Sequence, residues 1–229
     1  MKIGGLQKLT LLDYPQKLAC TLFLSGCNLR CPYCHNGGLV LPERMEGTIP
    51  EAQLLDFLSR RQGKLDGICV TGGEPTIWED LPEFMEKLRD LGFSLKLDTN
   101  GSNPQMVKRL LQQGLLQYVA MDIKNCPKAY RETCGGRDIL DSVRETLELL
   151  KGSGIPYELR TTVCRPFHSP ERIRQLARWI RGTEHYYLQN FVDSGNLVGE
   201  GVSGFSPEEM EDLARAAREF VPGTEIRGL

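Results

Sequence analysis

The sequence contains no long hydrophobic run and almost no excess of charge. Its longest apolar stretch, near LACTLFL, is far too short to span a bilayer, and its opening residues MKIGGLQKLT lack the continuous apolar segment of a signal peptide. The 28 basic and 30 acidic residues leave a formal net charge of −2, so no strong field attracts nucleic acid or an anionic membrane. These absences predict a cytoplasmic protein that binds neither a membrane nor nucleic acid.

Low-complexity linkers and shifts of composition are also absent. At 229 residues the chain matches the length of roughly 200–250 residues over which barrel-like α/β units still form one domain. We therefore predict a single domain over residues 1–229.

Eight cysteines are present, and three of them lie close together in the segment SGCNLRCPYCHNG. A reducing compartment and a chain too long to need covalent staples argue against disulfides, whereas the clustering favours metal binding. The clustered residues are Cys27, Cys31 and Cys34. The scattered ones are Cys20, Cys69, Cys126, Cys134 and Cys164, and the pair in NCPKAYRETCGG is expected to consist of incidental thiols.

Short apolar runs alternate with amphipathic stretches, and Gly, Asn, Asp or Pro follows each run. This rhythm predicts repeated βα units. The expected strands are 18–24, 67–71, 94–98, 118–123, 157–163 and 185–190. Six helices are expected. The first follows Thr48, the second ends at Gly92, and the third begins with Asn103 as N-cap. The other three cover roughly 138–151, 169–181 and 206–220.

Strands joined by helices pair in parallel with right-handed crossovers. The unusual polar groups follow strand after strand: the cysteines, then TGGEPT, DTNG and MDIK. In a barrel, chemistry gathers at the C-terminal ends of the strands. We therefore predict an α/β fold, a partial (β/α)6 barrel in which helices surround a curved parallel sheet.

The cysteine spacing C-x3-C-x2-C can bring three sulfurs around one metal centre, and soft thiolates select zinc, copper(I) or iron–sulfur clusters. His35 could complete a structural Cys3His zinc site. Alternatively, three cysteines on a four-iron cluster leave one iron open to a ligand. The segment CNLRCPYC, with Tyr33 before the third cysteine, resembles the signature loop of radical S-adenosylmethionine (SAM) enzymes, and this resemblance implies a [4Fe-4S] cluster that binds SAM at its open iron.

Two further motifs strengthen the resemblance. TGGEPT resembles the family segment that holds the amino group of SAM, which implies that Gly72, Gly73 and Glu74 bind the cofactor; alone, it could be a turn with a solvated acid. LDTNG is similar to a segment of activating enzymes for glycyl radical proteins and implies that Asp98 faces the cofactor. Otherwise Asp98 would cap the TNG turn.

Lys124 of MDIK and Arg160 of LRTTV are expected to project toward the same mouth, although each could be a strand-end surface charge. The resemblance also points to the end of the last predicted strand. The pyruvate formate-lyase activator has a histidine near the cofactor there, but this chain has YLQNF, which leaves Asn190 as the nearby polar candidate. Whether a monovalent cation binds near Asp98 stays open.

Over nearly the whole chain, the sequence resembles activating proteins of anaerobic ribonucleoside-triphosphate reductase. The resemblance implies that a flavodoxin- or ferredoxin-type donor reduces the cluster and that SAM is cleaved to methionine and a 5′-deoxyadenosyl radical. This radical removes hydrogen from a glycine of the partner protein. The cofactor carries the chemistry, and no catalytic residue beyond cluster and cofactor is expected.

Two alternatives remain at this point. The first is a radical SAM enzyme that acts on a small molecule such as a deazapurine precursor. The second is a non-enzymatic zinc or iron–sulfur module.

Overall fold

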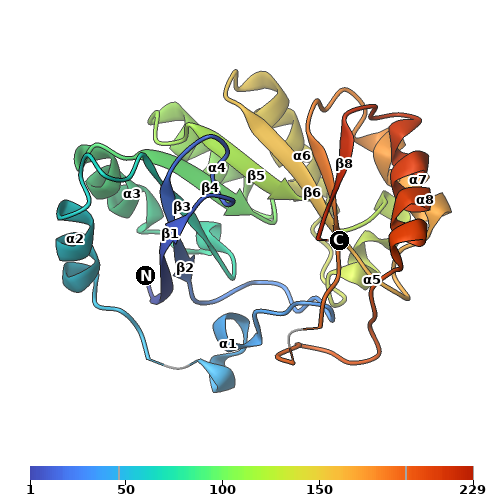
Figure 1. Ribbon diagram of the computed structural model, residues 1–229, viewed down its shortest axis with the longest axis horizontal. Helices are drawn as coiled ribbons and strands as arrows, with labels where there is room; N and C mark the ends of the chain where they lie inside the picture. Colours follow the sequence, from blue (N-terminus) through green and yellow to red (C-terminus); the bar gives the residue numbers. More distant parts are fainter. Residues whose placement is uncertain (46, 194, 229) are drawn as a thin grey trace.

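The computed structural model describes residues 1–45, 47–193 and 195–228. Its centre is an eight-stranded sheet in which the strands follow one another in chain order (Figure 1). The strands are β1 Ile3–Thr10, β2 Ala19–Leu24, β3 Gly67–Gly72, β4 Ser94–Thr99, β5 Tyr118–Asp122, β6 Tyr157–Val163, β7 Tyr186–Asn190 and β8 Thr224–Arg227.

Neighbouring strands from β2 to β8 pair in parallel, and β1 adds to the edge in the antiparallel sense. The α/β class and the curved parallel sheet are therefore confirmed, and the six predicted strands correspond to β2–β7. The sheet nevertheless has two more strands than predicted. β1 carries two glycines and the exposed run Gln7, Lys8 and Leu9, and β8 has only four residues, so neither shows a clear apolar strand pattern.

Helices form an arc around the outside of the sheet, from α2 through α3, α4 and α6 to α7 and α8 (Figure 1). These six agree with the predicted helices to within a few residues at their ends. Two short helices, α1 and α5, were not predicted. The bounds are α1 Gly37–Val40, α2 Glu51–Ser59, α3 Leu81–Asp90, α4 Pro104–Gln112, α5 Tyr130–Thr133, α6 Leu140–Gly152, α7 Pro170–Trp179 and α8 Pro207–Arg218.

Local capping explains where several helices begin. The Asn103 side chain accepts a hydrogen bond from the Met106 N–H at 3.2 Å, as its predicted N-cap role requires. Ser206 and Glu209 form a reciprocal capping box at the start of α8. No helix in the described part of the chain is long and apolar enough to cross a membrane.

The strands have two chemically different faces. Fully buried side chains such as Leu97, Met121 and Leu159 belong to the hydrophobic core. Their strand neighbours Asp98, Asp122 and Arg160 instead line a cavity. Because side chains alternate along a strand, each strand presents apolar residues to the core and polar residues to the inner, concave side.

Core packing on β4 gives the first prediction. Leu97→Ala should lower the free energy of unfolding by about 2–5 kcal/mol, because Leu97 is completely buried and its truncation leaves a cavity. Urea unfolding monitored by circular dichroism measures the change. The matched control is Leu12→Ala, at a leucine that is 89% exposed, where a loss of less than about 0.5 kcal/mol is expected. Equal losses would contradict the assignment of Leu97 to the core.

Candidate active site

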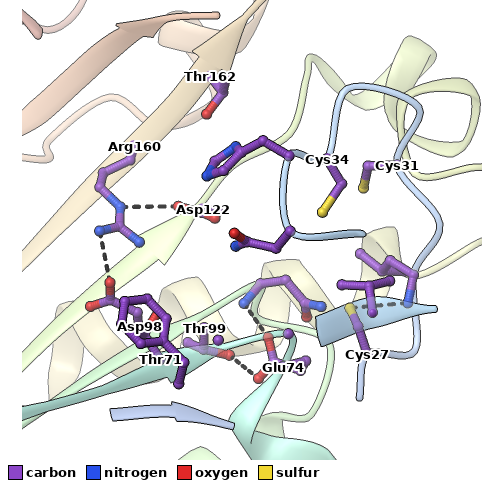
Figure 2. Close-up of a pocket in the computed structure, with 18 of the residues that line it drawn as sticks. Cys27, Cys31, Cys34, Thr71, Glu74, Asp98, Thr99, Asp122, Arg160 and Thr162 are labelled. Carbon is purple, nitrogen blue, oxygen red and sulfur yellow. Dashed lines mark hydrogen bonds and ion pairs between the residues drawn. The ribbon is translucent and has the colours of Figure 1, made fainter. Parts of the chain in front are cut away.

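A cavity of about 310 Å³ lies against the C-terminal ends of the parallel strands. Figure 2 shows the three clustered cysteines on one side of it and Arg160, Asp98 and Asp122 on the other. All but one of the predicted site residues line this cavity. The ten predicted residues that line the cavity are Cys27, Cys31, Cys34, Tyr33, Gly72, Gly73, Glu74, Asp98, Lys124 and Arg160.

The cysteines lie on the loop between β2 and α1, and side chains from neighbouring loops hold that loop in place. The Asn28 amide donates a hydrogen bond to the Ser102 hydroxyl at 2.8 Å and accepts one from the Asn100 amide at 3.1 Å. The Trp78 ring N–H donates to the Ser25 carbonyl at 3.0 Å. The cysteine loop is thus bonded to both of the strand-end segments that carry the other two motifs.

The three thiols suit a metal centre by their chemistry. Burial raises the pKa of Cys27 to about 12 and also raises the pKa of Cys34. These thiols therefore carry their protons until a bound metal displaces them. In the described part of the chain, no three His, Cys, Asp or Glu side chains converge tightly enough to hold a single metal ion.

Cys134 belongs to this environment, although the sequence suggested an incidental thiol. The neighbouring Cys134 thiol, together with burial, raises the pKa of Cys31. The adjoining Gly135 packs so closely on the cysteine loop that a Cβ there would lie 2.3 Å from the Arg30 carbonyl oxygen. The segment after α5 therefore packs directly against the cysteine loop.

Gly72 and Gly73 allow close packing, but of the chain on itself. A Cβ on Gly73 would lie 2.0 Å from the Gly26 carbonyl oxygen, and one on Gly72 would lie 2.3 Å from that of Leu24. Two backbone hydrogen bonds join the same segments. The Gly73 N–H donates to the Leu24 carbonyl and the Glu74 N–H donates to the Gly26 carbonyl, both at 2.8 Å. The paired glycines thus join the end of β3 to the start of the cysteine loop.

Glu74 is 1% exposed and accepts four hydrogen bonds from the protein. Its Oε1 accepts from the Thr76 N–H, the Thr76 hydroxyl and the Thr99 hydroxyl, and its Oε2 accepts from the Asn100 N–H at 2.6 Å. Burial raises its pKa, which these bonds partly offset. The observed partners of Glu74 join β3 to β4; its predicted role toward an ammonium group stays a prediction.

Opposite the cysteines, acidic and basic side chains alternate across β4, β5 and β6. Lys96 and Arg160 both bond to Asp98, the latter at 2.9 Å. Arg160 Nε also bonds to Asp122 at 3.0 Å, and Lys124 Nζ lies 2.9 Å from the other Asp122 oxygen. We call these five residues the charged network. Asp98 therefore forms ion pairs here, and both Lys124 and Arg160 are members of the network rather than isolated surface charges.

Sequence reasoning missed Lys96 and Asp122, although Lys96 lies in the predicted strand 94–98 and Asp122 in the motif MDIK. The sequence does contain a signal that could have identified them, namely a spacing of two residues from a predicted site residue. Lys96 precedes Asp98 by two residues, and Asp122 precedes Lys124 by two. Residues at this spacing share one face of a strand. Their partner, Arg160, comes from another strand, and no local pattern announces that contact.

Asn190 differs from the other candidates, because it does not line the cavity. Its amide group donates to the Phe205 carbonyl at 2.8 Å and accepts from the Phe205 N–H at 2.9 Å. The preceding residue, Gln189, lines the cavity instead, together with Thr162 on β6. Gln189 and Asn190 point to opposite faces of β7 because neighbouring strand residues alternate.

Tyr33 is 4% exposed and packs its ring against Phe167 and His168, with centroid distances of 6.1 and 6.4 Å. Its hydroxyl has no hydrogen-bond partner within the described chain. His168 bonds through Nε2 to the Lys124 carbonyl at 2.9 Å.

A late segment of the chain also braces the cysteine loop. The Val198 N–H donates to the Cys34 carbonyl at 3.0 Å, and the Gly199 N–H donates to the Pro32 carbonyl at 2.9 Å. The Arg44 guanidinium donates to the Leu197 carbonyl at 2.8 Å. We call residues 196–199 the strap.

With this geometry in view, comparison with known proteins identifies the family. A model described as the radical SAM superfamily matches residues 21–180, a span that includes the cysteine loop and the whole charged network. The chain belongs to the radical SAM superfamily and is a radical SAM enzyme. Its cofactors are a [4Fe-4S] cluster and SAM, as the resemblance implied.

Individual relatives support this membership. A Methanocaldococcus jannaschii protein with the provisional name glycyl-radical enzyme activating enzyme is 31% identical, over 98% of this chain and 95% of its own length. A Pyrococcus abyssi protein with the provisional name GTP 3′,8-cyclase is 29% identical, over 81% of this chain and 56% of its own.

Among solved structures, SuiB of Streptococcus suis bound to SAM superimposes with a TM-score of 0.69 at 15% identity. The match covers 91% of this chain and 52% of SuiB, so the present chain spans about half the length of that protein. At this identity the likeness shows the fold.

The charged network gives the second prediction. At pH 7, Asp98→Asn should lower the free energy of unfolding by about 3–5 kcal/mol, because Lys96 is 1% exposed and would stay buried without its carboxylate partner. Burial opposes the charged form of Asp98, but Arg160 and Lys96 outweigh it and hold its pKa below the ordinary value.

A lowered carboxylate pKa stabilises the fold above the unfolded-state pKa, about 4, and this stabilisation is lost as the pH falls toward the folded-state pKa. The wild type should therefore lose stability below about pH 4 more steeply than Asp98→Asn. Urea unfolding at pH 7 and at acidic pH measures both effects, with Asp141→Asn, at a side chain that is 96% exposed, as the control. Parallel pH profiles for wild type and Asp98→Asn would contradict the prediction.

The strap gives the third prediction. Gly199→Ala should lower the free energy of unfolding by about 1–3 kcal/mol, because the new methyl group would lie 2.9 Å from the Pro32 Cα and push the strap off the cysteine loop. Iron and sulfide content after anaerobic reconstitution should fall with it. Gly152→Ala, with no atom within 4 Å of its new methyl group, serves as the control and should retain full iron. Full iron and unchanged stability in Gly199→Ala would disprove the bracing role.

Proposed function

We propose that this protein is an activating enzyme that removes a hydrogen atom from a glycine of a partner protein. The partner that we propose is an anaerobic ribonucleoside-triphosphate reductase. The observation that carries this proposal is the 31% identity to a glycyl-radical enzyme activating protein over almost the full length of both chains. The motifs PYCHN, GGEPT, DTNG and MDIK support the same group, because they surround one cavity.

Within this proposal, Cys27, Cys31 and Cys34 hold the cluster, and the site suits it by its three soft donors on one cavity wall. When bound and reduced, the cluster supplies an electron that cleaves SAM to methionine and a 5′-deoxyadenosyl radical, which removes the hydrogen atom. The fourth iron has no cysteine assigned to it and is left for SAM.

The remaining side chains orient SAM and exclude side reactions. Gly72, Gly73 and Glu74 fix the strand-end segment beside the cysteine loop, and the ring of Tyr33 packs that loop against Phe167 and His168. Asp98, Lys124 and Arg160 present fixed charges that cost no reorganisation on binding, because their ion pairs already hold them.

A small-molecule substrate is the second candidate, since GTP 3′,8-cyclase relatives also match. Their match covers 56% of the Pyrococcus abyssi protein, against 95% of the Methanocaldococcus jannaschii protein. The full-length match therefore favours the activating enzyme. A zinc-stabilised, non-enzymatic module is the third candidate and predicts one zinc with no acid-labile sulfide.

The test of the proposed function uses the anaerobically reconstituted protein, dithionite and SAM. We expect iron and sulfide near four atoms of each per chain, formation of 5′-deoxyadenosine, and a glycyl radical signal in electron paramagnetic resonance when an anaerobic ribonucleotide reductase is added. Cys31→Ala should lose at least about 100-fold in 5′-deoxyadenosine formation, because the cluster loses a ligand. Formation of 5′-deoxyadenosine without any glycyl radical would disprove the activating role. Absence of 5′-deoxyadenosine would disprove the radical chemistry itself.

A further inference from the structure

Four exposed basic side chains belong to the cysteine loop and to the α5 segment that packs on it. Arg30 lies on the loop, Lys128 precedes α5, and Arg131 and Arg137 lie in and after α5. All four side chains are exposed, and none forms an ion pair within the described chain. We call them the basic patch.

Packing connects the patch to the cluster ligands. The Arg30 guanidinium donates to the carbonyls of Cys27 and Leu29, both at 2.8 Å, so its charge lies over the backbone between two cysteines. Gly135 packs against the Arg30 carbonyl, and Arg131 Nε donates to the Gly136 carbonyl at 2.9 Å. The α5 segment and the tip of the cysteine loop therefore form one continuous surface.

The patch keeps its charge. The neighbouring acid Glu132 is paired with Arg172 at 3.5 Å, which leaves Asp138 as the exposed acid within the same stretch. Some exposed arginines on the outer helices are paired with acids; Arg174, for example, bonds to both Glu171 and Glu219. A set of unpaired cations gives a local positive potential that speeds association with an acidic surface.

None of the four side chains lines the cavity. A macromolecule seated on the patch would therefore lie next to Cys31 without occupying the site where SAM and the glycine must meet. This placement suits a partner that exchanges an electron with the cluster and does not suit one that inserts a residue into the cavity.

We infer that the basic patch is the docking surface for an acidic one-electron donor protein of the flavodoxin or ferredoxin type. The inference rests on the proposed function, since the cluster must be reduced before SAM is cleaved. In each encounter the donor loses one electron and the cluster gains it, and no bond is made or broken. The partner is recognised by charge rather than by an apolar groove.

The test compares two double charge reversals in the reconstituted holoenzyme. Lys128→Glu with Arg137→Glu changes the patch at two side chains that form no hydrogen bond in the described chain. Lys64→Glu with Lys108→Glu, at exposed positions near α2 and in α4, makes the same total change of charge far from the cysteine loop. The probes are reduced flavodoxin, reduced ferredoxin and dithionite.

We expect the patch variant to slow cluster reduction by the protein donor at least about tenfold at low ionic strength, and to weaken the binding of oxidised flavodoxin to a similar extent. Salt should slow the wild-type reaction more than that of the patch variant. The control variant should behave as wild type, and 5′-deoxyadenosine formation with dithionite should be unchanged in both.

Equal effects of the two variants would overturn the docking site, and so would failure of both protein donors to reduce the wild type while dithionite succeeds. A loss of glycyl radical formation by the patch variant with dithionite, at unchanged deoxyadenosine formation, would assign the patch to the glycine-bearing partner and also overturn it. Failure of the proposed function is distinct, because the wild type would then form no deoxyadenosine even with dithionite.

Discussion

The site depends on two carboxylates shared among three cations inside the curved sheet. Asp98 and Asp122 on neighbouring strands are both bonded to Arg160 on a third, and Lys96 and Lys124 complete the set. Each buried charge has a partner of opposite sign, which is the condition under which ionised groups persist away from water. The network lines the inner face with fixed charge without an unpaired group.

A second constraint is the close packing between strand ends. Gly72 and Gly73 bring β3 against the start of the cysteine loop, and Glu74 bonds onward to the end of β4. Three motifs that are far apart in the chain thereby become one rigid rim. Their residue types follow from contacts within the protein as much as from any contact with a ligand.

Local patterns revealed much of this arrangement. The cysteine spacing and the βα rhythm act over a few residues, so the cysteine loop, the strands β2–β7 and the outer helices could be predicted. Contacts between distant segments could not be predicted: Arg160 meets Asp122 from another strand, Cys134 meets Cys31 from the segment after α5, and the strap meets the loop from beyond β7. Asn190 shows a further limit, because a shift of one residue along a strand exchanges the inner face for the outer one and puts Gln189 in the cavity.

The strap also sets an order of events during synthesis. Pro32 and Cys34 leave the ribosome before the backbone groups of Val198 and Gly199 that bond to them, because strands β3 to β7 lie between these two segments of the chain. A nascent chain therefore carries its three cysteines on an incompletely held loop until the segment after β7 has been made.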